Sequence, residues 1–146
     1  MNVDGVYSID APAEKVYAAL LDPIILARCM PGCDELVSTG PGEYQMKMKI
    51  ALAAFSGLFG GKVRITDENP PVSYRMVVEG SGKAGFLKGD GTITLVPGEQ
   101  ATTVEYKGHA QVGGTIAAVG QRLVDTTARM IIRKFFEKLA ENVKAA

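Results

Sequence analysis

The stretch EYQMKMKI, residues 43–50, alternates apolar and polar side chains without a break. The polar side chains are those of Gln45, Lys47 and Lys49, and the apolar ones are those of Tyr44, Met46, Met48 and Ile50. Strict two-residue alternation is typical of a β-strand with one buried and one solvated face. The stretch therefore predicts one strand of a sheet that is covered on one side only.

The same alternation continues on both sides of this stretch, from residue 34 to residue 112. It recurs in GKVRITD (61–67), VSYRMVVEG (72–80), GDGTITLV (89–96) and TTVEYKGHAQV (102–112). Turn residues separate these segments at 69–71, near 83–86 and at Pro97-Gly98. Consecutive strands joined by tight turns predict an antiparallel meander.

The residues before the meander predict one more strand and two short helices. Residues 3–9 alternate as a strand, and Asp10 is expected to cap a helix that carries Pro12 and Glu14 in its first turn. A second helix is expected to begin at Pro23. Pro31-Gly32 then ends it, because proline halts a helix and glycine permits a positive φ.

The last third of the chain, residues 115–144, predicts a long amphipathic helix of roughly 40 Å. It contains no proline, and Gly120 is the residue that interrupts a run of good helix formers. Its sheet-facing stripe is expected to contain Ile116, Gly120, Leu123, Thr127, Met130, Ile131, Phe135 and Leu139. We expect one domain over residues 1–146, with the element order β-α-α-β6-α.

Composition narrows the classes of function. The chain has 146 residues and a formal net charge of zero, so no broad basic surface for nucleic acid is expected. The N-terminus has no apolar run after a basic start, and no window reaches the ~18 apolar residues of a membrane span. These features predict a cytoplasmic chain.

Both cysteines lie in RCMPGCDEL, residues 28–36. Cys29 and Cys33 could form a redox pair or half of a metal site, but zinc takes roughly four ligands and His109 is the one histidine. We favour two structural thiols. The segment GSGKAG, residues 80–85, fits GxGxxG, yet a strand pattern follows it, so we expect a glycine-rich hairpin and not a nucleotide site.

The apolar face of the predicted sheet mixes methionines and tyrosines with glycines, among them Gly80, Gly89, Gly91 and Gly108. Flexible methionines and missing side chains fit a ligand cavity. A packed core in a strongly curved sheet would use glycines in the same way, at bends and bulges. The residues alone support these two interpretations equally.

The element order resembles the helix-grip fold of the birch-pollen-allergen and START-like superfamily. Within it, RCMPGCDEL (28–36), GKVRITDENPP (61–71) and GQRLVDTTARMIIRKFFEKL (120–139) are similar to segments of the CoxG family, which is named for the G subunit of carbon monoxide dehydrogenase. The resemblance implies an α+β fold in which a curved antiparallel sheet of about seven strands wraps around the C-terminal helix.

The resemblance also favours the cavity, with a lipophilic ligand such as a quinone or a lipid. Its implied partner is a molybdenum-containing oxidoreductase of the carbon monoxide dehydrogenase type. We expect no catalytic residues, no metal and no resident cofactor. The expected ligand-binding residues are Tyr44, Met46, Met48, Phe55, Leu58, Tyr74, Met76, Val78, Gly120, Leu123, Thr127 and Ile131. Two alternatives remain: a helix-grip cyclase or hydrolase that uses pocket tyrosines, and a docking or maturation factor without a ligand.

The uncharged segment ALAAFSGLFGG, residues 51–61, is expected to form an apolar hairpin between two strands. Phe55 and Leu58 either fold into the core or form a gate that touches the membrane or a partner. Many relatives continue into a hydrophobic tail, whereas this sequence ends at Ala146. We therefore expect peripheral contact with the inner face of the membrane and not a permanent anchor.

Overall fold

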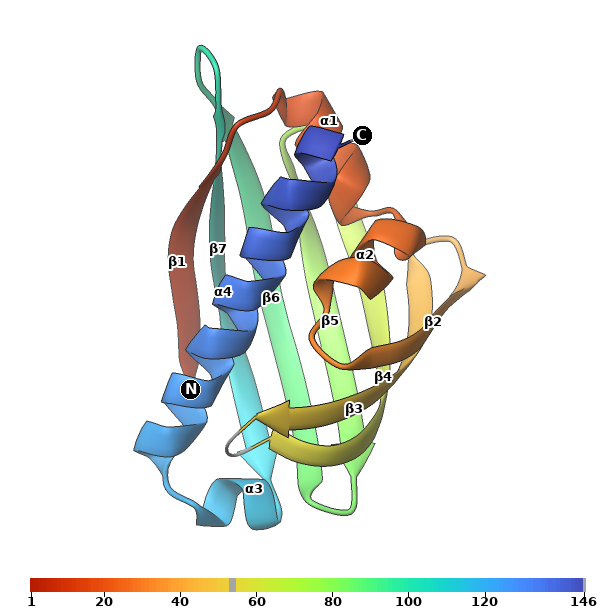
Figure 1. The fold of residues 1–146 in the computed structure, drawn as a ribbon, viewed down its shortest axis with the longest axis vertical. Helices are drawn as coiled ribbons and strands as arrows, with labels where there is room; N and C mark the ends of the chain where they lie inside the picture. Colours follow the sequence, from red (N-terminus) through yellow and green to blue (C-terminus); the bar gives the residue numbers. More distant parts are fainter. Residues whose placement is uncertain (53–54, 146) are drawn as a thin grey trace.

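A computed structural model describes residues 1–52 and 55–145 of the chain, without the side chains of residues 52, 55, 56 and 145 (Figure 1). Within these residues, one antiparallel sheet and four helices form the α+β fold that the sequence predicts. The strands are β1 (Asn2–Ile9), β2 (Cys33–Gly40), β3 (Glu43–Leu52), β4 (Phe55–Asn69), β5 (Ser73–Gly82), β6 (Gly85–Pro97) and β7 (Thr102–Gly113). The helices are α1 (Ala13–Leu20), α2 (Pro23–Cys29), α3 (Thr115–Ala118) and α4 (Gln121–Ala145).

The strand order in the sheet is β1-β7-β6-β5-β4-β3-β2, so the predicted meander is confirmed. The first strand pairs with the last one, and Gly5 lies opposite Tyr106. The curved sheet wraps around α4, which crosses its concave face diagonally (Figure 1). Helices α1 and α2 lie beside the C-terminal half of α4, and α3 lies at the other end of the sheet.

The starts of α1 and α2 differ from each other in how they are capped. Asp22 caps α2, because its carboxylate accepts a hydrogen bond of 2.9 Å from the amide of Ile24. The predicted cap by Asp10 is wrong. Pro12 occupies the N-cap position of α1, so Asp10 lies two residues before it and its carboxylate instead lies 3.6 Å from Nζ of Lys144.

The Pro31-Gly32 reversal forms as predicted. Gly32 has a φ of 75°, and a Cβ at this position would lie 2.1 Å from the carbonyl oxygen of Lys49. Only glycine fits such a close approach of two backbone segments. Both cysteines beside this turn are free thiols, Cys29 being fully buried and Cys33 half-buried.

The predicted continuous C-terminal helix is wrong at Gly120. This residue has a φ of 106° and separates α3 from α4. A Cβ built on Gly120 would meet no described atom within 4 Å, so the glycine serves the break and does not face the sheet. The break changes the phase of the helix: Leu123 is 40% exposed, and Val124 begins the buried stripe of α4.

Candidate functional site

The buried side chains of the concave face form two separate clusters. The larger cluster lies under α1 and α2 and contains fully buried Ile9, Val104 and Leu139. The smaller one lies near α3 and is built on Ile116 and Val124. The concave face therefore has a packed end and a second small core. Between them lies an intermediate region whose side chains, among them Met46 and Met76, pack against the larger cluster but are only partly buried.

Glycines dominate the sheet in this intermediate region. Five of them lie on the concave face of β4 to β7, and we call them the glycine band: Gly61, Gly80, Gly89, Gly91 and Gly108. Gly61 pairs with Gly80, and Gly91 pairs with Gly108. The side chains next to them across the ladders are Met46 opposite Gly61, Val78 opposite Gly89 and Met76 opposite Gly91.

Two glycines of the band are required by a close backbone approach. A Cβ on Gly108 would lie 2.3 Å from the carbonyl oxygen of Asp90, and a Cβ on Gly91 would lie 2.9 Å from that of Lys107. Both distances are shorter than a real Cβ contact. At this point β6 and β7 curve too tightly for a side chain, as the packed-core interpretation expects.

Gly80 and Gly89 have a different environment. The one described atom within 4 Å of a Cβ on Gly80 would be the carbonyl oxygen of Gly60, at 3.8 Å. At Gly89 the described atoms would be the carbonyl oxygen of His109, at 3.7 Å, and Cβ of Val78, at 4.0 Å. All three atoms belong to neighbouring strands. Among the described residues, therefore, no side chain of α4 packs directly on these two glycines.

The side chains around Gly80 and Gly89 agree with open space above them. Met46, Met76 and Val78 point to the concave face, yet all three stay partly accessible to solvent. Further along β5, by contrast, Tyr74 lies under α1 and is 3% exposed. The glycine band is thus an apolar floor that the helix leaves incompletely covered.

The predicted ligand-binding residues fall into three groups. Those on the concave face or the facing side of α4 are Tyr44, Met46, Met48, Tyr74, Met76, Val78, Thr127 and Ile131. Those on the surface are Leu58, Gly120 and Leu123. The side chain of Phe55 lies outside the described residues. The sequence analysis places Gly80 and Gly89 on the apolar face but does not include them among the ligand-binding residues, because alternation alone does not tell a glycine at a bend from one that leaves space.

Three tyrosine side chains meet beside the band, under α1. The Tyr17 hydroxyl donates to the carbonyl oxygen of Ser73 at 3.1 Å, and the Tyr44 hydroxyl donates to that of Leu21 at 2.9 Å. Tyr74 is 3% exposed, and its ring meets that of Tyr17 edge to face at 5.7 Å. Burial raises the pKa of Tyr74, so its hydroxyl stays protonated at neutral pH and can donate a hydrogen bond.

The other polar groups near the interior are engaged or hard to ionise. Thr102 donates to the carbonyl oxygen of Ala11 at 2.7 Å, and Thr127 donates to that of Leu123 at 2.8 Å. Burial raises the pKa of the Cys29 thiol to about 11, and it also raises the pKa of Cys33. The thiols are therefore protonated at neutral pH, and this arrangement suits the binding of an apolar molecule better than nucleophilic chemistry.

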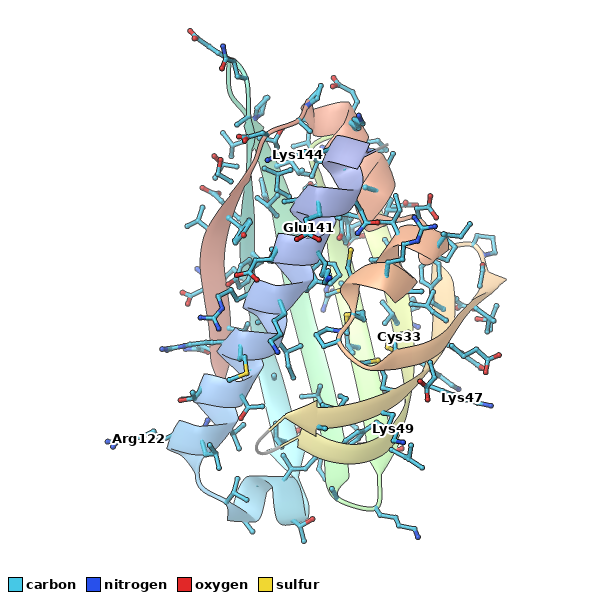
Figure 2. All side chains as sticks on the ribbon, in the orientation of Figure 1. Cys33, Lys47, Lys49, Arg122, Glu141 and Lys144 are labelled. Carbon is cyan, nitrogen blue, oxygen red and sulfur yellow. The ribbon has the colours of Figure 1, made fainter. Side chains whose placement is uncertain are left out.

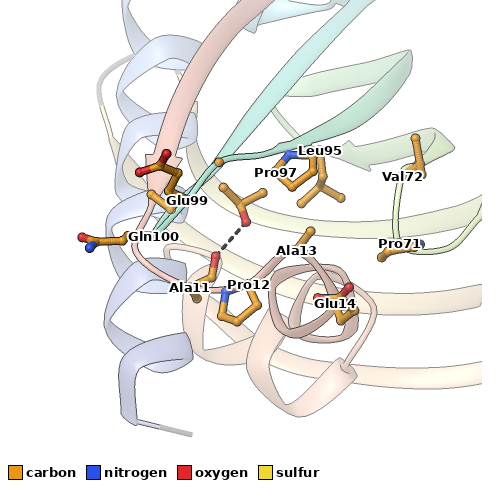
Figure 3. A pocket seen from close by; sticks show the side chains of 13 residues that line it. Ala11, Pro12, Ala13, Glu14, Pro71, Val72, Leu95, Pro97, Glu99 and Gln100 are labelled. Atoms are coloured by element: carbon orange, nitrogen blue, oxygen red, sulfur yellow. Dashed lines mark hydrogen bonds between the residues drawn. The ribbon is translucent and has the colours of Figure 1, made fainter.

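Two hollows of about 280 Å³ each open on the surface at opposite ends of the sheet. The first lies between the start of α1 and the β6–β7 turn, where Glu14, Glu99 and Leu95 are among its lining residues (Figure 3). The second lies beside α3 and is lined by Met1, Ala110, Gln111, Val112, Ala117, Gln121 and Val124. None of the predicted ligand-binding residues with a described side chain lines either hollow. The second hollow reaches Val124, in the small core that borders the glycine band.

A curved antiparallel sheet around a long C-terminal helix defines a helix-grip, START-like protein. A START superfamily protein from Mycobacterium smegmatis has this fold, with a TM-score of 0.80 at 14% identity over 99% of this chain and 97% of that one. A protein from Chromobacterium violaceum, CV1439, gives a TM-score of 0.72 at 22% identity over 97% and 96% of the two chains.

A conserved protein from Geobacillus kaustophilus is more similar, with a TM-score of 0.96 and 34% identity over 99% of this chain and 96% of that one. The family model of CoxG, the G subunit of carbon monoxide dehydrogenase, matches residues 5–144. The chain therefore belongs to the CoxG family. No curated protein matches the chain. In the described part of the chain, no helix combines the length and hydropathy that are needed to cross a bilayer.

Proposed function

We propose that the protein is a carrier that binds a hydrophobic small molecule over the glycine band, between the sheet and α4. The observation that carries this proposal is the environment of Gly80 and Gly89, where the described neighbours of a Cβ come from adjacent strands and none from α4. The partial exposure of Met46, Met76 and Val78 supports the same space. Apolar clefts with few polar groups are typical binding sites for small molecules.

The ligand class that these groups suit best is a quinone. Gly80 and Gly89 leave backbone without side chains against which a planar ring can lie, and Met46 and Met76 can adapt their side chains to its edges. Tyr74 lies two residues from Met76 on the same face of β5, and its protonated hydroxyl can donate to a carbonyl oxygen. A lipid with a carbonyl group satisfies the same contacts, and the experiment below separates the two.

Membership of the CoxG family supports a role as an accessory protein of a partner enzyme. In this proposal the partner is a molybdenum-containing oxidoreductase of the carbon monoxide dehydrogenase type, and the protein acts as its ligand-binding accessory at the inner face of the membrane. In this proposal Tyr74 orients the ligand and transfers no group to it. The hydroxyls of the other tyrosines and of the buried threonines already donate to backbone carbonyl oxygens.

The first test is to fill the space above the band. Gly89→Leu should place an isobutyl group there and weaken the binding of decylubiquinone at least tenfold, measured by quenching of tyrosine fluorescence. Lys88→Leu is the matched control, because it adds a leucine to the exposed face of the same strand. Gly80→Val is a second variant in case Gly89→Leu fails to fold, which circular dichroism will reveal.

The second test identifies the natural ligand. Protein isolated from its own cells is extracted with organic solvent, and the extract is analysed by mass spectrometry. A stoichiometric quinone or lipid that is lost from Gly89→Leu supports the proposal and decides between the two classes. If the folded Gly89→Leu and Gly80→Val variants bind decylubiquinone as the wild type does, the glycine band is not the binding site.

A further inference from the structure

The sheet has two open edges, because β1 and β2 stand at the two ends of the strand order. In Figure 1, no strand of the described chain lies beyond β1 on the side away from β7. An open edge presents backbone N–H and C=O groups that have no partner strand, and natural proteins block such edges to prevent pairing with other chains. The two edges of this sheet differ in how well they are blocked.

The β2 edge is blocked in three ways. Its ladder with β3 shifts register twice, after Cys33 and after Ser38, and such irregularities bend a strand away from straight pairing. Helix α2 contacts β2, and Figure 2 shows Cys33 beside the turn that follows this helix. Figure 2 also shows Lys47 projecting outward on the same side of the molecule, and its ammonium group lies 3.5 Å from the carboxylate of Glu35. The β2 edge is therefore irregular, partly covered and charged.

The β1 edge is regular and open. All eight residues of β1 pair with β7 without a register shift. The strand contains no proline, lysine or arginine, and Asp4 is its one charged residue. Val6, in the middle of the strand, is 63% exposed. A straight edge with an exposed apolar side chain at its centre is suited to pairing with a strand of another molecule.

The hydrogen bonds at the start of the ladder identify the groups of β1 that face outward. The Met1 amino group donates to the carbonyl oxygen of Ala110 at 3.1 Å, and the Ala110 amide donates to that of Met1 at 2.9 Å. Pairs that exchange two such bonds alternate with pairs that exchange none in an antiparallel ladder. The odd-numbered residues of β1 therefore bond to β7. The residues whose N–H and C=O groups point away from β7 are Asn2, Asp4, Val6 and Ser8, and their side chains are also exposed.

These outward-facing groups are complementary to those of a second copy of β1. An antiparallel register centred on Val6 places this residue opposite itself and places Asp4 opposite Ser8 of the other copy. The two valine side chains then cover each other, the Ser8 hydroxyl can donate to the Asp4 carboxylate, and no like charges lie opposite each other. A register centred on Gly5 is less favourable, because it makes the two Asp4 carboxylates diagonal neighbours and places Val6 opposite a carboxylate.

We infer that the protein forms a two-fold dimer by antiparallel pairing of β1 with β1 of a second copy, centred on Val6. Each Asp4–Ser8 pair and the central Val6 pair exchange two hydrogen bonds, and the two seven-stranded sheets become one. Both concave faces then lie on the same side of the joined sheet. One strand from each copy buries less than the ~1,200 Å² of a standard interface, so the dissociation constant should be on the order of 50 µM.

The first test is sedimentation equilibrium of the whole chain from about 5 µM to about 500 µM, over which monomer should give way to dimer. Val6→Lys should weaken dimerisation at least tenfold, because it places two ammonium groups opposite each other. Val6→Pro should do the same, because it removes an amide that faces the second copy and no bond to β7. The matched control is Val37→Lys at the β2 edge, where the valine is 43% exposed, and it should dimerise within twofold of the wild type.

The second test measures the register of the two strands. In a Cys29→Ala/Cys33→Ser background, bismaleimidoethane should join Val6→Cys to its copy, because paired Cα atoms lie about 5.5 Å apart. Asn2→Cys is the matched control on the same face of the same strand. Its copy lies about 26 Å further along the joined strands in this register, so it should not be crosslinked.

Protein that stays monomeric over the whole concentration range would overturn the inference and leave the β1 edge to a strand of a different protein. Equal loss of dimer in Val37→Lys and Val6→Lys, or crosslinking of Asn2→Cys without Val6→Cys, would place the interface elsewhere and would also contradict it. Circular dichroism checks the folding of both Val6 variants, and Val6→Lys changes an exposed side chain only.

The dimer does not depend on the proposed function, because the β1 edge lies outside the glycine band. Binding of decylubiquinone to Val6→Lys should therefore stay within twofold of the wild type. Loss of the dimer with quinone binding intact concerns the β1 edge alone, whereas loss of quinone binding in Gly89→Leu with the dimer intact concerns the glycine band alone.

Discussion

The packed end and the glycine band lie on the same concave face and follow the same two-residue alternation, but they differ in what fills them. At the packed end, Ile9 and Val104 of the sheet and Leu139 of α4 are completely buried. In the band, Gly80 and Gly89 have no side-chain neighbour from α4 among the described residues. Alternation thus determines which residues face inward, and side-chain volume determines whether that interior closes.

The residues that stabilise the fold therefore differ from those that are proposed to bind the ligand. Complete burial of aliphatic side chains stabilises a fold by ~1.5–3 kcal/mol for each residue. The band contributes less, because glycines bury almost no apolar area and the methionines beside them remain partly exposed. A protein whose packed end holds the fold together can leave the band open for a ligand.

The largest expected effect compares Leu139 with Met76. Leu139→Ala removes a completely buried side chain and should lower the free energy of unfolding by about 3 kcal/mol. Met76→Ala, beside the glycine band, should lower it by about 1 kcal/mol, because this side chain is only partly buried. Urea denaturation of both variants measures the difference. Equal losses would mean that the band is packed as tightly as the other end.

The second comparison is between two glycines of the glycine band, Gly108 and Gly89. Gly108→Ala should cost about 2–3 kcal/mol, because its methyl group would lie 2.3 Å from the carbonyl oxygen of Asp90. Gly89→Ala should change the free energy of unfolding by less than about 0.5 kcal/mol or raise it slightly, because the methyl group has room and alanine restricts the unfolded chain. Both variants are compared in urea. A lower free energy of unfolding for Gly89→Ala would show that another side chain packs directly on Gly89.

A smaller effect on the free energy of unfolding should come from the ionisation of Cys29, at the packed end, as the pH rises. Burial raises the pKa of its thiol from 9.0 to about 11. Between these values the unfolded chain releases a proton that the folded chain retains, so this contribution to stability is complete below pH 9 and is lost as the pH rises to 11. The loss should reach about 1 kcal/mol at pH 10.

The control for this prediction is Cys29→Ala, compared with the wild type by denaturation at pH 8 and pH 10. The variant should lose less stability between the two pH values. Some loss should remain, because burial also raises the pKa values of Tyr17 and Tyr44. Identical pH profiles for the two proteins would place the Cys29 thiol in contact with water and weaken the description of the packed end.

The smallest expected effect is at Cys33, the first residue of β2, which is half-buried and whose thiol donates to the carbonyl oxygen of Glu35 at 3.6 Å. Cys33→Ser should change the free energy of unfolding by less than about 0.5 kcal/mol. Binding of decylubiquinone should stay within twofold of the wild type. A large loss of decylubiquinone binding in Cys33→Ser would show that Cys33 takes part in ligand binding and is not only a structural thiol.

The sequence predicts most of the fold because alternation is local and uninterrupted. Each strand of the meander follows from it directly. The turn at Pro31-Gly32 follows instead from the backbone properties of proline and glycine. The break at Gly120 was missed because a single glycine is compatible with a helix interior, and only its φ of 106° distinguishes a break from a continuous helix. The cap by Asp10 was predicted wrongly, because Pro12 occupies the N-cap position of α1.

The candidate site was predictable in part. The sequence identifies Met46, Met76 and Val78 because they are apolar residues on the inward face of their predicted strands. The structure places these side chains beside the glycine band. The two roles of the glycines could not be separated by sequence, because Gly89 and Gly91 occupy equivalent positions two residues apart on β6. The two kinds of glycine differ in how close a Cβ would lie to the backbone of the neighbouring strand. This distance is short where the sheet curves tightly and long where space is left.

The pairing of β1 with β7 has a consequence for how the molecule is made. Met1 and Ala110, joined by a hydrogen bond of 3.1 Å, are 109 positions apart in the chain. Strands β2 to β7 pair with their sequence neighbours and can assemble one hairpin at a time as the chain emerges from the ribosome. The first strand to be synthesised must wait for the last, and long-range closure of this kind is slow. Until β7 has been synthesised, the amides and carbonyls of β1 have no partner strand in this sheet, and an unpaired strand is a site where other chains can pair.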